Sequence, residues 1–134
     1  MGYRSEVSIT IPNSAFQELV AKSKVENRDA YEFIKSGVIF QTDKFTTVNF
    51  KWIKWYEDYE EVQFIKGFIR SIPHVFNRIG EDYEDIENDV DNITDYGILD
   101  CVCIIRCLDV ENAGELITIG EEGGEADGDR KQAV

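Results

Sequence analysis

Residues 38–54 decide the fold, and their sequence is VIFQTDKFTTVNFKWIK. Two runs rich in β-branched and aromatic residues flank the polar residues 42–44, a pattern typical of a β-hairpin. In the second run apolar and polar side chains alternate, so successive residues are expected on opposite faces of a strand. One face is expected to carry Val48, Phe50 and Trp52, and the other Thr47, Asn49 and Lys51.

A strand and a helical region precede this hairpin. Apolar residues at every second position predict a half-buried strand over residues 4–11. Pro12 and the small polar residues after it favour the start of a helix. Apolar residues at helical spacing then predict two helical pieces, residues 13–24 and 29–35.

A second helix and two further strands follow the hairpin. Residues 57–72 begin with four carboxylates, which favour a helix N-terminus, and continue as a broad apolar stripe that ends before Pro73. Residues 75–79 alternate again and predict a strand. Residues 99–109 are almost wholly apolar, which predicts a central strand covered on both faces.

The order strand–helix–strand–strand–helix–strand–strand predicts an α+β fold, with a mainly antiparallel sheet and two main helices on one face. Its first six elements follow the ferredoxin-like order β-α-β-β-α-β, to which an extra strand and an acidic insertion are added. We expect a single domain over residues 1–111. Residues 112–134 are expected to form an acidic, Gly-rich and largely disordered tail, in which residues 116–119 could add an edge strand.

Charge is distributed unevenly along the 134 residues, whose net charge is −13. Residues 1–56 carry eight basic and six acidic side chains, whereas residues 57–134 carry six and twenty-one. This excess disfavours direct binding to nucleic acid or to an anionic membrane, because both attract Lys and Arg. It favours a basic protein partner. The alternative, that the acidity only keeps the protein soluble, stays open.

Residues 81–95 hold eight carboxylates and no basic side chain. Tyr83, Ile86, Val90 and Ile93 recur there at steps of three and four, which predicts a short amphipathic helix with its acids facing water. We expect this segment to bind a basic partner. The candidate partner-binding acids are Glu81, Asp82, Glu84, Asp85, Glu87, Asp89 and Asp91.

Aromatic residues form the other unusual cluster of the sequence. Trp52 is expected in the core by strand alternation, whereas Trp55 and Tyr56 stand at a strand–helix junction beside Glu57 and Asp58. Exposed aromatic side chains near acids suit an Arg-rich partner, so Trp55 and Tyr56 are further candidate binding residues. The alternative is that they cap the core.

The three cysteines, Cys101, Cys103 and Cys107, do not have the spacing of zinc ligands. A fourth ligand is also wanting, because His74 is the one histidine of the chain. Neighbours two apart on one strand are poorly placed for a disulfide as well. We therefore expect buried free thiols, and neither a metal nor another cofactor.

Other chemistries find little support. Residues 89–95 resemble a calcium loop, but Ile93 and Thr94 stand where an oxygen ligand and a glycine are needed. A nucleophilic enzyme with a histidine base would depend on His74, which is more simply a surface histidine or one whose hydrogen bonds are satisfied within the fold. An enzyme built on paired carboxylates stays open as an alternative.

Two blocks of the sequence resemble a group of small uncharacterised phage and prophage proteins. They are GYRSEV at residues 2–7 and RIGEDYEDIE at residues 78–87, and the aromatic residues 51–56 are similar in style. The resemblance implies a viral accessory gene. It implies no activity and no site residues.

We therefore expect a non-enzymatic phage accessory protein whose acidic, nucleic-acid-mimicking surface inhibits a basic, nucleic-acid-binding host or defence protein, such as a restriction or CRISPR effector. One alternative is a small enzyme or ligand-binding domain with a carboxylate pocket. Another is a self-associating virion or assembly component. The sequence has no apolar run of membrane-spanning length and no signal-peptide pattern near Met1, so we expect the host cytoplasm, without contact to membranes or to nucleic acid itself.

Overall fold

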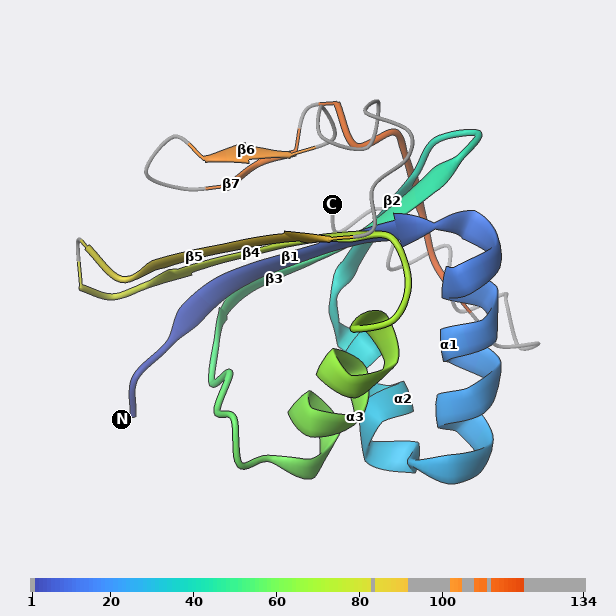
Figure 1. Ribbon diagram of the computed structural model, residues 1–134, viewed down its shortest axis with the longest axis horizontal. Coiled ribbons are helices and arrows are strands. Elements are labelled where there is room, and N and C mark those ends of the chain that lie inside the picture. The colour runs from blue at the N-terminus through green and yellow to red at the C-terminus, as the bar shows by residue number, and fades with distance from the viewer. Residues whose placement is uncertain (1, 83, 92–101, 105–107, 111, 120–134) are drawn as a thin grey trace.

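A computed structural model of the chain describes residues 2–82, 84–91, 102–104, 108–110 and 112–119. These residues form an α+β fold in which a six-stranded antiparallel sheet carries three helices on one face (Figure 1). A small two-stranded sheet lies over the opposite face. None of the described helices is long and apolar enough to cross a membrane.

The order of elements confirms most of the expected pattern, with the first helical region split into two helices at Asn27. The Asn27 side chain accepts a hydrogen bond from the Ala30 N–H at 3.0 Å and thereby caps the second helix. The elements are β1 (Ser5–Pro12), α1 (Asn13–Glu26), α2 (Arg28–Ser36), β2 (Val38–Gln41), β3 (Phe45–Ile53), α3 (Glu60–Ile69), β4 (His74–Gly80), β5 (Ile86–Asp91), β6 (Cys103–Ile104), β7 (Leu108–Asp109) and β8 (Glu115–Ile117).

The strand order in the large sheet is β5-β4-β1-β3-β2-β8. Both β1 and β2 pair antiparallel with β3, which lies between them, so β1 and β2 run parallel to each other. This is the split β-α-β arrangement of the ferredoxin-like fold. Two strands extend that core at its edges, β5 beside β4 and β8 beside β2.

The main core lies between the sheet and the helices. Alternate residues of β1, β3 and β4 point to the helices, where they meet the apolar stripes expected for α1, α2 and α3. Full burial of one large apolar side chain contributes about 1.5–3 kcal/mol, so this cluster dominates the stability of the fold. Its buried members include Val7, Ile9, Ile11, Phe16, Leu19, Ile34, Val48, Phe50, Val62, Ile65, Ile69 and Phe76.

The opposite face of β1 is polar, yet it is buried as well. Glu6, Ser8 and Thr10 are each almost inaccessible, and β7 lies over this side of the sheet. The strand predicted over residues 4–11 is thus confirmed as β1, but the expectation that one of its faces is exposed is wrong. The sequence does not show that a later segment returns to cover the polar face.

The expectation of one central strand over residues 99–109 is also wrong. The described part of this segment holds the short strands β6 and β7, which pair only with each other. The segment is apolar because it covers a sheet: Val102 and Leu108 are buried against Ile79. Cys103 lies in β6, whereas Cys101 and Cys107 lie outside the described residues.

The acidic segment is a strand and not the expected amphipathic helix. Ile86 and Val90 are four residues apart, a spacing that fits one face of a helix and equally one face of a strand. Pairing with β4 decides between the two, because it provides the backbone hydrogen bonds of β5. Tyr83 and Ile93, which extended the helical pattern, lie outside the described residues.

The sheet continues beyond residue 111, where the sequence places the end of the domain. Glu115–Ile117 forms β8, the edge strand that the pattern of residues 116–119 predicts, and Ile117 lies opposite Ile39 of β2. The rest of the expected tail, residues 120–134, lies outside the described residues.

A β-bulge near the end of β3 changes which aromatic residues enter the core. Val7 lies opposite Phe50, but Ser5 lies opposite Ile53, so β3 contains one extra residue between these pairs. Trp52 is located there with a φ of 50°, a left-handed conformation that is rare for a large side chain. The bulge leaves Trp52 48% exposed and brings Ile53 to the core, so the prediction of a buried Trp52 is wrong.

Candidate functional site

The candidate acids lie along one border of the sheet. Glu81, Asp82 and Glu84 belong to the turn between β4 and β5, Asp85 directly precedes β5, and the others belong to β5 itself. We call the described carboxylates of this border the acidic edge. They are Glu81, Asp82, Glu84, Asp85, Glu87 and Asp89; Asp91 ends β5.

The register between β4 and β5 places part of the acidic edge on the helix side of the sheet. Glu87 lies opposite Arg78, and Asp89 lies opposite Phe76, whose side chain belongs to the core beneath the helices. Strand alternation puts Ile86 and Val90 on the other face. The acids of β5 therefore form one row and its apolar residues another.

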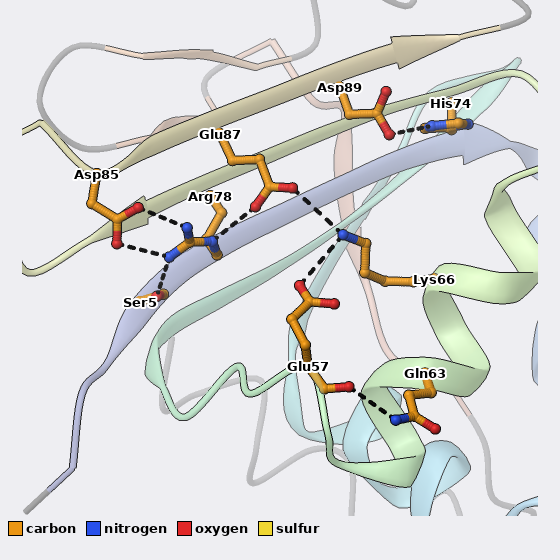
Figure 2. A network of polar contacts seen from close by, with 9 residues as sticks. All are labelled: Ser5, Glu57, Gln63, Lys66, His74, Arg78, Asp85, Glu87 and Asp89. Atoms are coloured by element: carbon orange, nitrogen blue, oxygen red, sulfur yellow. Dashed lines mark hydrogen bonds and ion pairs between the residues drawn. The ribbon is translucent and has the colours of Figure 1, made fainter.

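Arg78 holds two of these carboxylates (Figure 2). Its Nη2 and Nη1 lie 2.7 and 3.1 Å from the two carboxylate oxygens of Asp85, and its Nε lies 3.0 Å from Glu87 Oε1. A planar guanidinium suits such a two-oxygen contact. Arg78 Nη1 also donates to Ser5 Oγ at 3.0 Å, which connects the pair to β1.

This geometry keeps Asp85 ionised. The hydrogen bonds from Arg78, and then from the Tyr3 hydroxyl, hold the pKa of the Asp85 carboxyl below its usual value. The same contact with Asp85 raises the pKa of Arg78. A carboxyl with a lowered pKa is a poor general acid near neutral pH, so this pair does not resemble the acid of a carboxylate enzyme.

Lys66 and His74 hold the remaining acids of the row. Lys66 Nζ of α3 lies 3.5 Å from both Glu57 and Glu87, and so connects the helix to the edge strand. His74 is buried, and its Nδ1 lies 2.8 Å from the Ile72 carbonyl oxygen. Its Nε2 lies 3.2 Å from Asp89 Oδ2 (Figure 2). Sequence reasoning leaves open a surface histidine or one with satisfied hydrogen bonds, and the burial and contacts of His74 show the second.

The positive groups of this network lie deeper than the negative ones. The side chains of Arg78 and Lys66 are 18% and 23% exposed, whereas those of Asp85, Glu87 and Glu57, which they hold, are 31%, 36% and 66% exposed. These two cations pair with three carboxylates, so negative charges outnumber positive ones in the network. The carboxylates are Glu57, Asp85 and Glu87. The surface that a partner meets at this border is therefore acidic, although the acids are paired within the molecule.

The N-terminal residues hold the β4–β5 turn in place. The Tyr3 hydroxyl donates to Asp85 Oδ2 at 2.6 Å and accepts the Asp82 N–H at 3.0 Å. The Arg4 N–H donates to Glu81 Oε2 at 2.8 Å. The carboxylates of Asp82 and Glu84 point to solvent, as both residues are exposed.

Neither of the two aromatic candidates is a free anchor. Trp55 is 5% exposed and packs among Phe33, Phe50 and Phe76, so the prediction that it binds a partner is wrong. Tyr56 is half-buried, and its hydroxyl accepts the Tyr3 N–H at 2.9 Å.

The exposed aromatic residues of this region are Trp52 and Tyr59. Sequence reasoning includes Tyr59 in the aromatic cluster but misses the exposure of Trp52, because strand alternation does not reveal the bulge that turns Trp52 outward. Arg4 connects Trp52 to the acidic edge, since its side chain donates to the Trp52 carbonyl oxygen at 3.1 Å and its backbone contacts Glu81.

Among the described residues no three His, Cys, Asp or Glu side chains converge as metal ligands would. Most of the partial calcium loop, including Ile93 and Thr94, lies outside these residues. Comparisons of the chain with family models, with curated proteins and with solved structures found no match.

Residues 2–7 and the described part of residues 78–87 meet in space. Ser5 of the first block contacts Arg78 of the second, and Tyr3 contacts Asp85. Residues 2–7 and 78–87 therefore form one structural unit, the corner of the sheet that carries the acidic edge.

Proposed function

We propose that this chain is a non-enzymatic binding protein whose acidic edge engages a basic, nucleic-acid-binding protein. The observation that carries the proposal is that, at this border of the sheet, the positive side chains are more deeply buried than the negative ones. Arg78 and Lys66 are 18% and 23% exposed, and each of the carboxylates that they hold is more exposed than either cation. The internal pairs fix the acids in position without removing the negative charge from the surface, which favours association with a positive groove.

The geometry of a strand supports mimicry of a nucleic acid. Residues two apart on one face of a strand are about 6.7 Å apart. Glu87 and Asp89 therefore present charges several ångström apart along a straight line, as the phosphates of a nucleic-acid strand do. A rigid row of this kind can occupy Lys and Arg side chains that otherwise neutralise phosphates.

The resemblance to phage proteins suggests the setting. In that setting the chain acts in the cytoplasm of an infected cell, and its target is a host or defence protein that binds nucleic acid. Inhibition follows directly from competition, because the same basic groove cannot hold both the acidic edge and a nucleic acid.

Affinity capture from a bacterial lysate tests this function. The wild-type chain is compared with a variant carrying Glu81→Gln, Asp82→Asn and Glu84→Gln, three exposed turn residues. A matched control neutralises the exposed acids Glu18, Glu26 and Asp43, which lie on other parts of the molecule. We expect a stoichiometric basic protein that duplex DNA displaces, whose capture the control retains and the turn variant loses.

The opposite pattern contradicts the proposal. If the turn variant and the control capture the same proteins equally, the acidic edge is only a solvated surface. If duplex DNA does not displace the captured protein, the mimicry is wrong even where a partner exists.

A further inference from the structure

The outer side of β5 is open in the described part of the chain. β5 is the last strand of the sheet on this side, and β4 is its one partner there. Ile86 and Val90 are 45% and 40% exposed on this strand. A six-residue edge with exposed apolar side chains is a template for another strand.

The register shows which backbone groups face outward. The Gly80 N–H donates to the Asp85 carbonyl oxygen at 2.8 Å, so these two residues form a hydrogen-bonded pair. Such pairs alternate along an antiparallel ladder. Glu87 and Asp89 therefore bond to β4, whereas the N–H and C=O groups of Asn88 and Val90 point away from it.

An added strand would meet two different rows of side chains. Ile86, Asn88 and Val90 lie on one face of β5, and the carboxylates of Glu87 and Asp89 lie on the other. The carboxylates would occupy non-hydrogen-bonded positions relative to the new strand, where facing side chains approach most closely. Basic residues of the added strand would thus be paired, and its apolar residues would cover Ile86 and Val90.

We propose that the outer side of β5 binds a β-strand of a protein partner, in which basic residues alternate with apolar ones. This inference rests on the proposed function and names how the basic partner is held. Backbone hydrogen bonds to Asn88 and Val90 provide affinity, and the two rows of side chains provide selectivity for the alternating pattern.

Charge argues against a second copy of the chain as the occupant. An antiparallel pair of β5 strands centred on Asn88 would place Glu87 opposite Asp89 of the second copy. Like charges directly opposite each other destabilise a strand pair. A strand with Lys or Arg at these positions replaces that repulsion by attraction.

The test uses a nine-residue peptide in which Lys and Val alternate, titrated into the ¹⁵N-labelled full chain. A peptide with Glu in place of Lys controls for charge, and a peptide with the same composition in two blocks controls for alternation. We expect shifts and at least tenfold slower exchange at the amides of Asn88 and Val90 with the alternating Lys peptide alone. Raising the salt from 50 to 500 mM should weaken this binding.

Variants of Val90 separate strand pairing from charge attraction. Val90→Pro removes an outward N–H without removing a bond to β4, and Val90→Thr is its matched control. We expect at least tenfold weaker peptide binding for the proline variant and wild-type binding for the threonine variant. If the proline variant does not fold, Val90→Lys, which keeps the backbone and repels the basic peptide, should give the same loss.

Three results would overturn the inference: equal binding of the alternating and block peptides, undiminished binding by a folded Val90→Pro variant (or by Val90→Lys in its place), or no binding at millimolar peptide. Concentration-dependent dimerisation that Val90→Pro abolishes would identify a second copy as the occupant instead. Capture from a lysate distinguishes a failure of strand pairing from a failure of the proposed function. A lysate partner that Val90→Pro still captures, but the turn variant loses, refutes strand pairing and supports the acidic edge.

Discussion

Arg78 is the side chain on which the attachment of the acidic edge depends. It joins β4 to Asp85, to Glu87 and, through Ser5, to β1. Its side chain is only 18% exposed, so its hydrogen bonds are shielded more than those of a surface ion pair. Removing the guanidinium leaves Asp85 without its cation and leaves Glu87 with Lys66 alone.

The variant Arg78→Met is therefore expected to lower the free energy of unfolding by about 1–3 kcal/mol. Urea denaturation measures this loss, with Arg70→Met as the control, because Arg70 is exposed. Arg78→Lys should recover only part of the stability, since an ammonium does not form the two-oxygen contact with Asp85. Equal stability of the Arg70 and Arg78 variants would contradict this role.

Asp85 makes a further contribution that depends on pH. Its pKa in the folded chain lies below the usual 3.8, so its ionised form stabilises the fold above that pH. This stabilisation is lost as the pH falls through the lowered pKa. We expect Asp85→Asn to be less stable than wild type by a constant amount above about pH 5, with the difference shrinking below pH 3.8. Thermal unfolding between pH 7 and 3 measures it; an unchanged difference would contradict the ion pair.

The sequence predicts a buried Trp52 and an exposed Trp55, whereas the structure shows the reverse, and the reason is physical. Alternation from Val48 and Phe50 places Trp52 in the core, and this holds only while the strand has no extra residue. The bulge shifts the pattern, exposes Trp52 and lets Trp55 enter the aromatic cluster. A bulge at a bulky residue with a φ of 50° has no local signature in the sequence.

At the scale of elements, a sequence pattern predicts secondary structure well when it fits only a helix or only a strand. A pattern that fits both does not. The apolar stripes of α1 and α3 continue over several turns and fit only helices. Residues 86–91 fit both periods, and only pairing with β4 makes them a strand. The acids of the candidate site were thus predicted, but their pairing with Arg78, Lys66 and His74 depends on long-range contacts.

Glu6 connects β7 to the large sheet. Its carboxylate is buried and lies 3.3 Å from Lys51 Nζ, 3.3 Å from Asn49 Nδ2 and 3.4 Å from the Leu108 N–H. We expect Glu6→Ala to lower the free energy of unfolding by about 1–3 kcal/mol and to speed hydrogen exchange at Leu108. Glu26→Ala, at an exposed residue of α1, is the control. Unchanged exchange at Leu108 would show that the apolar contacts alone hold this segment.

At the scale of the whole molecule, exposed acids are concentrated in the turn between β4 and β5. The turn residues Glu81, Asp82 and Glu84 are exposed and close together, and like charges in such a cluster repel one another. The triple variant Glu81→Gln, Asp82→Asn and Glu84→Gln should therefore keep or slightly raise the midpoint of thermal unfolding at low salt. A fall of several degrees would mean that these acids stabilise the fold, which would weaken the case for a binding role.

The most direct measurement of the central claim is the salt dependence of the affinity for the captured basic partner. Isothermal titration of the wild-type chain and of the turn variant is performed between 50 and 500 mM salt. If the acidic edge carries the binding, the wild-type affinity falls steeply with salt, and the turn variant binds more weakly with a shallower slope. Equal affinities and equal slopes for the two proteins would contradict the claim that the acidic edge is the binding surface.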